Sequence, residues 1–433
     1  MAVLSPRSAA GRFPALAYPA FRVFIIGQIV SLVGTWMQNL VLPYLAYRIS
    51  GQPIYLGLVS FAGTLPSAVL TLPAGVWVER LDKRKVVIAM QAVMMLQAFA
   101  LAALAFSGTI TIWYIIALSL VNGTANAFEI TARQTMQSEL VGKNALSSAI
   151  ALNGAAFNVA RIIGPALAAP FLLLFDQGGE GWAFFFNGVS YLAVIVGLMW
   201  IPRLNRGVAL DDAGEARPAR ARPVEAFRAG QAYIKSDGVA RMVIVMAGVV
   251  GLLGWPAIQQ LPVFARDVFA MPGDTEPLIA GRQSLMVTAQ GIGALAASLL
   301  LTWFASVRRK GLWMIAGQLA FALSLLGIAF ARTVEPTVPL MILGGWGMVT
   351  QNNNANQILQ LSIPREYRAR VFSTYLFALQ GITPLGSLLA GIIAQQFGAP
   401  TVALICGVAC LAAIGGHLLN DSIRTYRASD AQA

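Results

Sequence analysis

Three charged side chains inside apolar stretches are the groups in this 433-residue chain best suited to chemistry. Glu129 and Arg133 are four residues apart, so on a helix they share one face and can form an ion pair. Arg161 lies in the next apolar stretch, just before Gly164 and Pro165. A charge in hydrocarbon is costly unless it is paired or faces water, so Arg161 should point into a helix bundle. Glu129 is its nearest plausible partner by depth.

Two interpretations of these charged groups stay open. In the functional one they form a gate or a proton-coupled pair, with Glu129 as the proton carrier. In the structural one they are a static pair that holds the ends of two helices together. Gly164-Pro165 interrupts one apolar stretch and Thr383–Gly386 interrupts a later one. Such kinks suit bundles that rock against each other, although glycine and proline are also simply commoner in membrane helices.

The remaining reactive residue types do not form an enzyme site. The chain has one histidine, His417, and two cysteines, Cys406 and Cys410, which lie one turn apart on the same apolar segment. No phosphate-binding loop of the Gly-x-x-x-x-Gly-Lys type occurs, and no cluster has metal-ligand spacing. We expect no enzymatic activity, no cofactor and no metal.

The elements that position the charged residues are membrane helices. The chain is 57% hydrophobic and only 11% charged, with a mean hydropathy of +0.69. Its uncharged stretches form apolar segments long enough to span a bilayer with about 20 residues each. The twelve segments lie near 20–47, 54–78, 86–106, 110–132, 145–173, 182–201, 242–264, 283–305, 311–331, 338–361, 371–396 and 400–420. The sequence therefore predicts an all-α polytopic membrane protein with twelve transmembrane helices in two pseudo-symmetric six-helix bundles.

The net charge of +12 is an orientation signal. Most Lys and Arg residues fall in alternate loops, so the positive-inside rule places both termini in the cytoplasm and argues against nucleic-acid binding. We expect a cytoplasmic tail over 1–19, bundles over 20–201 and 242–420, a cytoplasmic linker over 202–241, and a tail over 421–433. Residues 224–234 of the linker are expected to form a short helix on the membrane surface.

A charged turn at 75–88 separates the second and third apolar segments. It contains Gly75, Glu79, Arg80, Asp82 and Arg84, and it must lie outside the bilayer. The two halves also look like a repeat with an offset of 223 residues. At this offset Gln134-x-x-Gln137 falls on Gln357-x-x-Gln360, and the basic turn falls beside 308–310, where no carboxylate occurs.

The turn resembles the loop between helices 2 and 3 of major facilitator transporters, with Glu79 and Asp82 in place of the usual Asp and second Gly. The runs 126–165 and 360–373 resemble the branch containing the enterobactin exporters and macrolide efflux proteins. This resemblance implies a secondary transporter of the bacterial inner membrane, an exporter, with proton antiport. It also implies that the turn is a conformational latch, in which Glu79 or Asp82 meets the start of helix 11. Arg368 and Arg370 lie at that end.

Polar and aromatic residues within spans are expected to line a substrate cavity. The residues chosen are Gln28, Trp36, Gln38, Asn39, Trp255, Gln259, Asn353, Asn356 and Gln357. Amides and aromatic rings without a deep carboxylate suit a large neutral or aromatic substrate, such as a siderophore or an amphipathic drug. The partners expected are a small-molecule substrate, protons and the lipid bilayer, for a monomer. The alternatives are an importer of a small organic solute, or a receptor or scaffold that does not transport.

Overall fold

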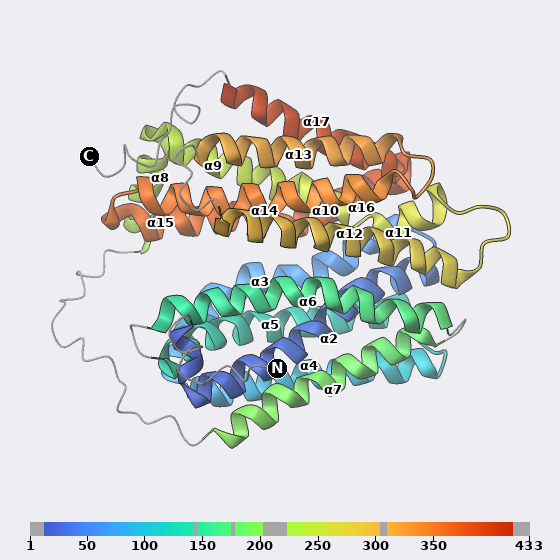
Figure 1. Cartoon of the computed structure of the whole chain (residues 1–433), viewed down its shortest axis with the longest axis horizontal. Coiled ribbons are helices and arrows are strands. Elements are labelled where there is room, and N and C mark those ends of the chain that lie inside the picture. The colour runs from blue at the N-terminus through green and yellow to red at the C-terminus, as the bar shows by residue number, and fades with distance from the viewer. Residues whose placement is uncertain (1–12, 142–144, 175–177, 202–222, 304–309, 419–433) are drawn as a thin grey trace, which may run out of the picture. The chain divides into compact units, whose positions relative to one another are not determined.

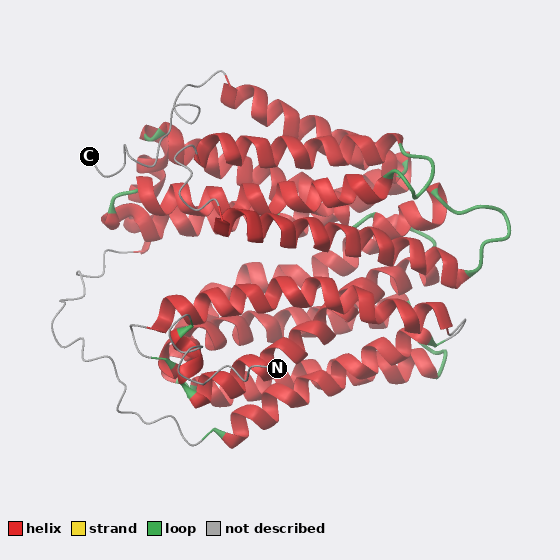
Figure 2. Ribbon diagram, in the orientation of Figure 1, coloured by secondary structure: helices red, strands yellow, loops and turns green. Residues whose placement is uncertain are grey.

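The computed structural model describes residues 13–141, 145–174, 178–201, 223–303 and 310–418. All regular structure in these ranges is helical (Figure 2). By its internal contacts the chain divides into two compact units. The first unit comprises residues 1–45 and 62–216, and the second comprises 46–61 and 217–433. Residues 46–61, which the hydropathy pattern places in the N-terminal bundle, are grouped with the second unit by these contacts.

The N-terminal half of the chain forms one short helix and six long ones (Figure 1). They are η1 (Pro14–Ala17), α2 (Pro19–Ser50), α3 (Pro53–Arg80), α4 (Lys83–Phe106), α5 (Ile112–Leu140), α6 (Leu146–Leu174) and α7 (Gly179–Trp200). Pro19 and Pro53 each occupy the first position of a helix, where the missing N–H is no loss. The carboxylate of Asp82 caps α4 by accepting a hydrogen bond from the backbone N–H of Lys85.

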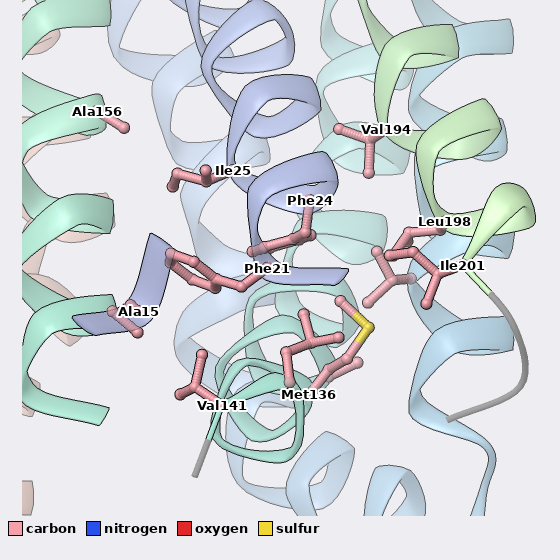
Figure 3. Packing of buried hydrophobic residues seen from close by; sticks show 14 of the residues in the cluster. Ala15, Phe21, Phe24, Ile25, Met136, Val141, Ala156, Val194, Leu198 and Ile201 are labelled. Atoms are coloured by element: carbon pink, nitrogen blue, oxygen red, sulfur yellow. The ribbon is translucent and has the colours of Figure 1, made fainter. Parts of the chain in front are cut away.

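Within the first unit, α4 packs along both α5 and α7. One end of the unit is closed by an apolar cluster that joins α2, α5 and α7 (Figure 3). Phe21 and Phe24 come from α2, Met136 from α5 and Leu198 from α7. All four are at most 1% exposed, so this end of the unit is tightly packed around the helices that carry the charged residues.

The charged turn is attached to its own unit by two side chains. Lys83 forms an ion pair with Glu139 near the end of α5, with Nζ and Oε1 3.5 Å apart. Arg84 donates a hydrogen bond of 2.9 Å to the carbonyl of Met199 in the last turn of α7. A cation at a helix C-terminus is favourable because the last carbonyls there lack intrahelical donors. The basic residues therefore connect the start of α4 with the ends of α5 and α7.

In the C-terminal part of the second unit, the first described helix is amphipathic α8 (Pro223–Ser236), at the position where the sequence predicts a short linker helix. It packs on α15 (Arg365–Leu376). The ring of Tyr233 stacks on Tyr367 with centroids 4.8 Å apart. Burial, together with the Asp237 carboxylate, raises the pKa of Tyr233 to about 12, so its hydroxyl stays neutral and donates to Asp237. The location of α8 on a membrane surface stays a prediction.

The seventh span is a helix with three interruptions over Gly238–Val268. Its parts are α9 (Gly238–Val249), the π-helix η3 (Val250–Gly254), α10 (Trp255–Ile258), α11 (Leu261–Val263) and the π-helix η4 (Phe264–Val268). Pro256 and Pro262 have no N–H to donate, which explains why regular α-helical bonding fails there. The break between α10 and α11 lies at Gln259-Gln260.

The rest of the second unit comprises α12 (Glu276–Trp303), α13 (Lys310–Phe330), α14 (Thr337–Ser362), α15, the π-helix η5 (Phe377–Gly381), α16 (Thr383–Phe397) and α17 (Ala399–Leu418). The chain runs from α15 through η5 into α16 as one span, interrupted just before Pro384. The interruption expected at Thr383–Gly386 therefore begins a few residues earlier, in η5. In the first unit α6 continues as an α-helix through Pro165.

The predicted spans and the observed helices agree to within eight residues at either end. In the described part of the chain, ten helices are long and apolar enough to cross a membrane. The other two predicted spans are α14 and α17. The polar run from Thr350 to Asn354 lowers the hydropathy of α14, and the apolar part of α17 is shorter, at Ala399–Gly415.

Candidate functional site

Glu129 lies at the centre of a buried hydrogen-bonded chain in the first unit. Its carboxylate accepts a hydrogen bond of 3.0 Å from Arg133 Nε, one turn further along α5. It also accepts one of 3.1 Å from Gln91 Nε2 on α4. Arg133 reaches Asn153 on α6 at 3.4 Å. Glu129 is 3% exposed, so these donors take the place of water around its carboxyl group.

The series of hydrogen bonds continues from Gln91 on α4 to residues of α2. Ser31 donates a hydrogen bond to Gln91 Oε1 at 3.4 Å. Thr35, one turn further along α2, donates to the Ser31 carbonyl and lies 3.4 Å from the hydroxyl of Tyr191 on α7. Side chains of α2, α4, α5 and α6 are therefore connected to one carboxylate, and the contact of Thr35 with Tyr191 of α7 lies one turn further along α2.

Arg161 on α6 lies over an aromatic ring of α2. Its guanidinium carbon is 5.5 Å from the centroid of Trp36, a distance suited to a cation–π contact. Phe157 meets the same ring edge-on at 5.4 Å. Gly164 allows this approach, because a Cβ there would lie 2.5 Å from Trp36 Cβ. Arg161 is 5% exposed and so points into the bundle as expected, while its pairing with Glu129 stays a prediction.

A second group of amides joins α2, α4 and α7. Gln38 donates to Gln97 at 3.4 Å and accepts a hydrogen bond of 2.8 Å from Asn187. Ser190 donates to the backbone carbonyl of Asn187 at 2.7 Å. Gln38 was predicted to line the cavity, but its amide is 4% exposed and engaged with neighbouring helices. These contacts join three helices, and a role of Gln38 in binding substrate stays a prediction.

The polar residues of the second unit are arranged differently from the hydrogen-bonded clusters of the first unit. Lys310 at the start of α13 donates to Gln357 at 2.6 Å. Asn354 donates to the carbonyl of Thr350 within α14. Several buried amides have polar atoms without a hydrogen-bond partner among the described residues, including both polar atoms of Gln260, Nε2 of Gln290 and Oε1 of Gln351. These atoms carry hydrogen-bonding capacity that the bundle itself does not use.

The other predicted cavity residues lie at a range of depths. Gln28 is buried, and its Oε1 has no hydrogen-bond partner in the described structure. Asn39 is exposed, whereas Trp36, Asn353 and Asn356 are half-buried. On the seventh span, Trp255 and Gln259 are half-buried beside the break between α10 and α11. A role of these residues in binding substrate stays a prediction.

The latch residues are only partly described. The side chain of Glu79 lies outside the described residues, Arg80 is exposed, and a Cβ at Gly75 would lie 4.0 Å from Thr131 Cγ2. In the second unit, Arg368 donates to the carbonyl of Ile363, and the guanidinium of Arg370 lies 6.0 Å from the Tyr367 ring. Because the two sets of residues belong to different units, their pairing stays a prediction.

A groove of about 690 Å³ lies between α4 and α5 beside the charged turn. Asp82 and Lys85 lie at its polar end, and Met90, Val93 and Phe128 are among the apolar residues that line it. None of the predicted cavity residues lines this groove, so it is not the predicted substrate cavity.

Sequence reasoning missed four residues that the structure brings into these clusters. Gln91, Gln97 and Asn187 are amides within otherwise apolar helices, and Lys310 is a buried cation at a helix start. An amide within an apolar span is a sequence signal for such a cluster, because burying it in a membrane span requires a partner on another helix. A single sequence does not show which residue of another helix is the hydrogen-bond partner.

The geometry fits that of known membrane transporters. The chain is 24% identical over 392 residues to the staphyloferrin A transporter of Staphylococcus aureus, covering 90% of this chain and 93% of that protein. It is 21% identical to macrolide efflux protein A of Streptococcus pyogenes, with the same coverage. It is 23% identical over 382 residues to the multidrug efflux pump Tap of Mycolicibacterium fortuitum, covering 87% of this chain and 89% of the pump.

Solved structures with the same fold include the nucleoside transporter NupG, with a TM-score of 0.73 at 14% identity, covering 93% of this chain and 98% of that one. A bacterial homologue of the human lysosomal transporter Spinster matches with a TM-score of 0.70 at 14% identity, covering 95% and 98%. A family model described as transmembrane secretion effector matches residues 10–433. The chain therefore belongs to this family of major facilitator transporters, and it is a multi-pass, twelve-helix membrane transporter rather than an enzyme.

Proposed function

We propose that this transporter is a proton-coupled exporter of a siderophore or an amphipathic drug-like molecule. It works as a monomer by alternating access, in the bacterial inner membrane with both termini in the cytoplasm. The observation that carries the proposal is the buried carboxylate of Glu129, held by Arg133 and Gln91 inside a membrane-spanning bundle. Intramembrane ionisable groups of this kind mark proton and substrate pathways. The relatives named for staphyloferrin A, macrolides and multidrug efflux support export.

The two units supply different parts of this mechanism. The ionised Glu129 neutralises Arg133, and a proton taken up by the carboxylate frees the guanidinium to find another acceptor. The second unit offers amides, including Asn353 and Asn356 on α14, that can hydrogen-bond a neutral substrate.

The test measures transport in both directions in oriented vesicles that carry an imposed proton gradient. The expected result is substrate efflux driven by proton influx, with Glu129→Gln losing the dependence on the gradient. Glu139→Gln is the matched control, because Glu139 lies on the same helix, is more exposed and pairs with Lys83. Gradient-driven uptake would reverse the proposed direction. Unchanged coupling in Glu129→Gln would remove this carboxylate from the mechanism.

A further inference from the structure

Gln91 holds a position that neither the predicted latch nor the predicted cavity explains. Its side chain is 2% exposed, near the middle of α4's contacts with α2 and α5. One end of the amide donates to Glu129, and the other end accepts from Ser31. A single side chain thus connects a carboxylate on α5 with a hydroxyl on α2.

Chemistry fixes the direction of these hydrogen bonds. An ionised carboxylate only accepts, so the NH₂ group of Gln91 must face Glu129. The carbonyl of the amide then faces α2, and Ser31 must act as the donor. Among these hydrogen-bonded groups, the charged carboxylate of Glu129 alone fixes the orientation of the Gln91 amide.

Protonation of Glu129 removes that constraint. A neutral carboxyl carries an O–H donor, which can be directed at the carbonyl of Gln91 once the amide has turned over. The NH₂ group then faces Ser31, whose oxygen becomes the acceptor. Thr35 bonds the backbone carbonyl of Ser31 and not its hydroxyl, so the change at α5 reaches α2 at the Ser31 hydroxyl, one turn from the contact of Thr35 with Tyr191 on α7.

We propose that Gln91 is a positioning residue that turns over with the protonation of Glu129 and so reverses the hydrogen bond to Ser31 on α2. This inference rests on the proposed function, in which Glu129 carries the coupled proton. The charged and titratable neighbours of Glu129 in the described contacts are Arg133 on its own helix and Tyr191 on α7. The groups from α2 and α4, Ser31 and Gln91, are neutral.

The first experiment compares Gln91→Met with Gln97→Met in the proton-driven transport assay. Methionine keeps the length of glutamine and removes both hydrogen bonds. Loss of a donor makes the carboxylate of Glu129 easier to protonate, so the half-maximal pH of transport should rise by about one unit in Gln91→Met. Gln97→Met removes an equally buried amide of the same helix that contacts Gln38 instead, and its midpoint should stay at the wild-type value.

An unchanged midpoint in folded Gln91→Met, or an equal shift in Gln97→Met, would overturn the inference. The second variant, Ser31→Ala, leaves the contact between Gln91 and Glu129 in place. It should keep the wild-type midpoint and lower the maximal rate of transport several-fold. A wild-type maximal rate in Ser31→Ala would show that nothing is transmitted to α2, and it would refute the proposal even if Gln91→Met failed to fold.

An infrared measurement separates this inference from the proposed function. A protonated carboxyl gives a C=O stretching band, and the band assigned to Glu129 should be absent in Glu129→Gln. It should appear at higher pH in Gln91→Met than in wild type. If Glu129→Gln keeps its proton coupling, the proposed function fails. If Glu129→Gln loses coupling and the band in Gln91→Met titrates as in wild type, only the role of Gln91 fails.

Discussion

The two halves of this transporter share a helix plan and differ in their buried chemistry. α3 covers Pro53–Arg80 and α12 covers Glu276–Trp303, the same length 223 residues later. At this offset Glu129 corresponds to Asn352 and Arg133 to Asn356. The first unit thus buries an ion pair where the second has two half-buried amides. Duplicated scaffolds can therefore keep their helix plan while only one copy holds an ion pair at these two positions.

The largest expected effect comes from breaking the ion pair that sets the halves apart. Arg133→Asn leaves the Glu129 carboxylate buried without its cation, which should cost about 3–5 kcal/mol of stability. The double variant Glu129→Asn/Arg133→Asn copies the second unit and should recover most of that loss. Thermal unfolding in detergent measures both. A double variant no more stable than Arg133→Asn would show that the pair is not the source of the difference.

The next largest effect is expected at the close contact between α2 and α6 in the first unit. Gly164→Leu forces a side chain against Trp36 Cβ and the Val33 carbonyl and should cost about 1–3 kcal/mol through overpacking. Gly154→Leu is the control on the same helix, because a Cβ at Gly154 meets nothing within 4 Å. Unfolding temperature and transport rate should both fall only in Gly164→Leu. Equal losses in the two variants would point to the helix itself rather than to this contact.

A similar comparison tests whether repeat positions have separate roles. Gln357→Leu removes the acceptor of Lys310 and should destabilise the protein by about 1–2 kcal/mol. Its repeat counterpart Gln134 is exposed, so Gln134→Leu should change stability by less than about 0.5 kcal/mol. Denaturant titration of both variants provides the measurement. Matching losses would contradict the asymmetry between the units.

The smallest expected effect concerns the charged turn, which has a carboxylate only in the first half. As a latch, Glu79 should favour one conformational state by about 1 kcal/mol, the size of a partly exposed charge contact, and Glu79→Ala should slow transport roughly fivefold. Transport by correctly inserted protein in vesicles measures this. Lys85→Ala is the control, because Lys85 is an exposed charge of the same turn that is not among the predicted latch residues. A wild-type rate in Glu79→Ala would refute the latch.

Much of the fold was predictable from hydropathy and charge. The twelve apolar segments match the observed helices because a bilayer demands internally bonded spans of a set length. The pairing of Glu129 with Arg133 followed from their spacing on one helix, and it is confirmed. The donors from other helices were not predictable. Gln91 and Asn187 contact residues far away in sequence, and which amides meet depends on helix rotation and crossing.

Local departures from helical geometry also escaped the sequence pattern. Pro256 and Pro262 indicate disturbance in the seventh span, but not that π-helices at Val250–Gly254 and Phe264–Val268 would flank them. The kink expected at Gly164-Pro165 is a continuous α-helix by its hydrogen bonding, whereas its counterpart in the second half includes η5. Matching proline positions therefore did not give matching backbone geometry.

The interruptions of the seventh span affect how its sequence can be aligned with the sequences of related proteins. A π-helix holds an extra residue per turn, so the periodicity that assigns side chains to faces restarts after each one. Residues seven apart share a face within α9, but not across Val250–Gly254 or Gln259-Gln260. Single-residue insertions and deletions should therefore be tolerated at these interruptions and rejected inside α9. Face-by-face alignment of this span is valid only within each helical piece.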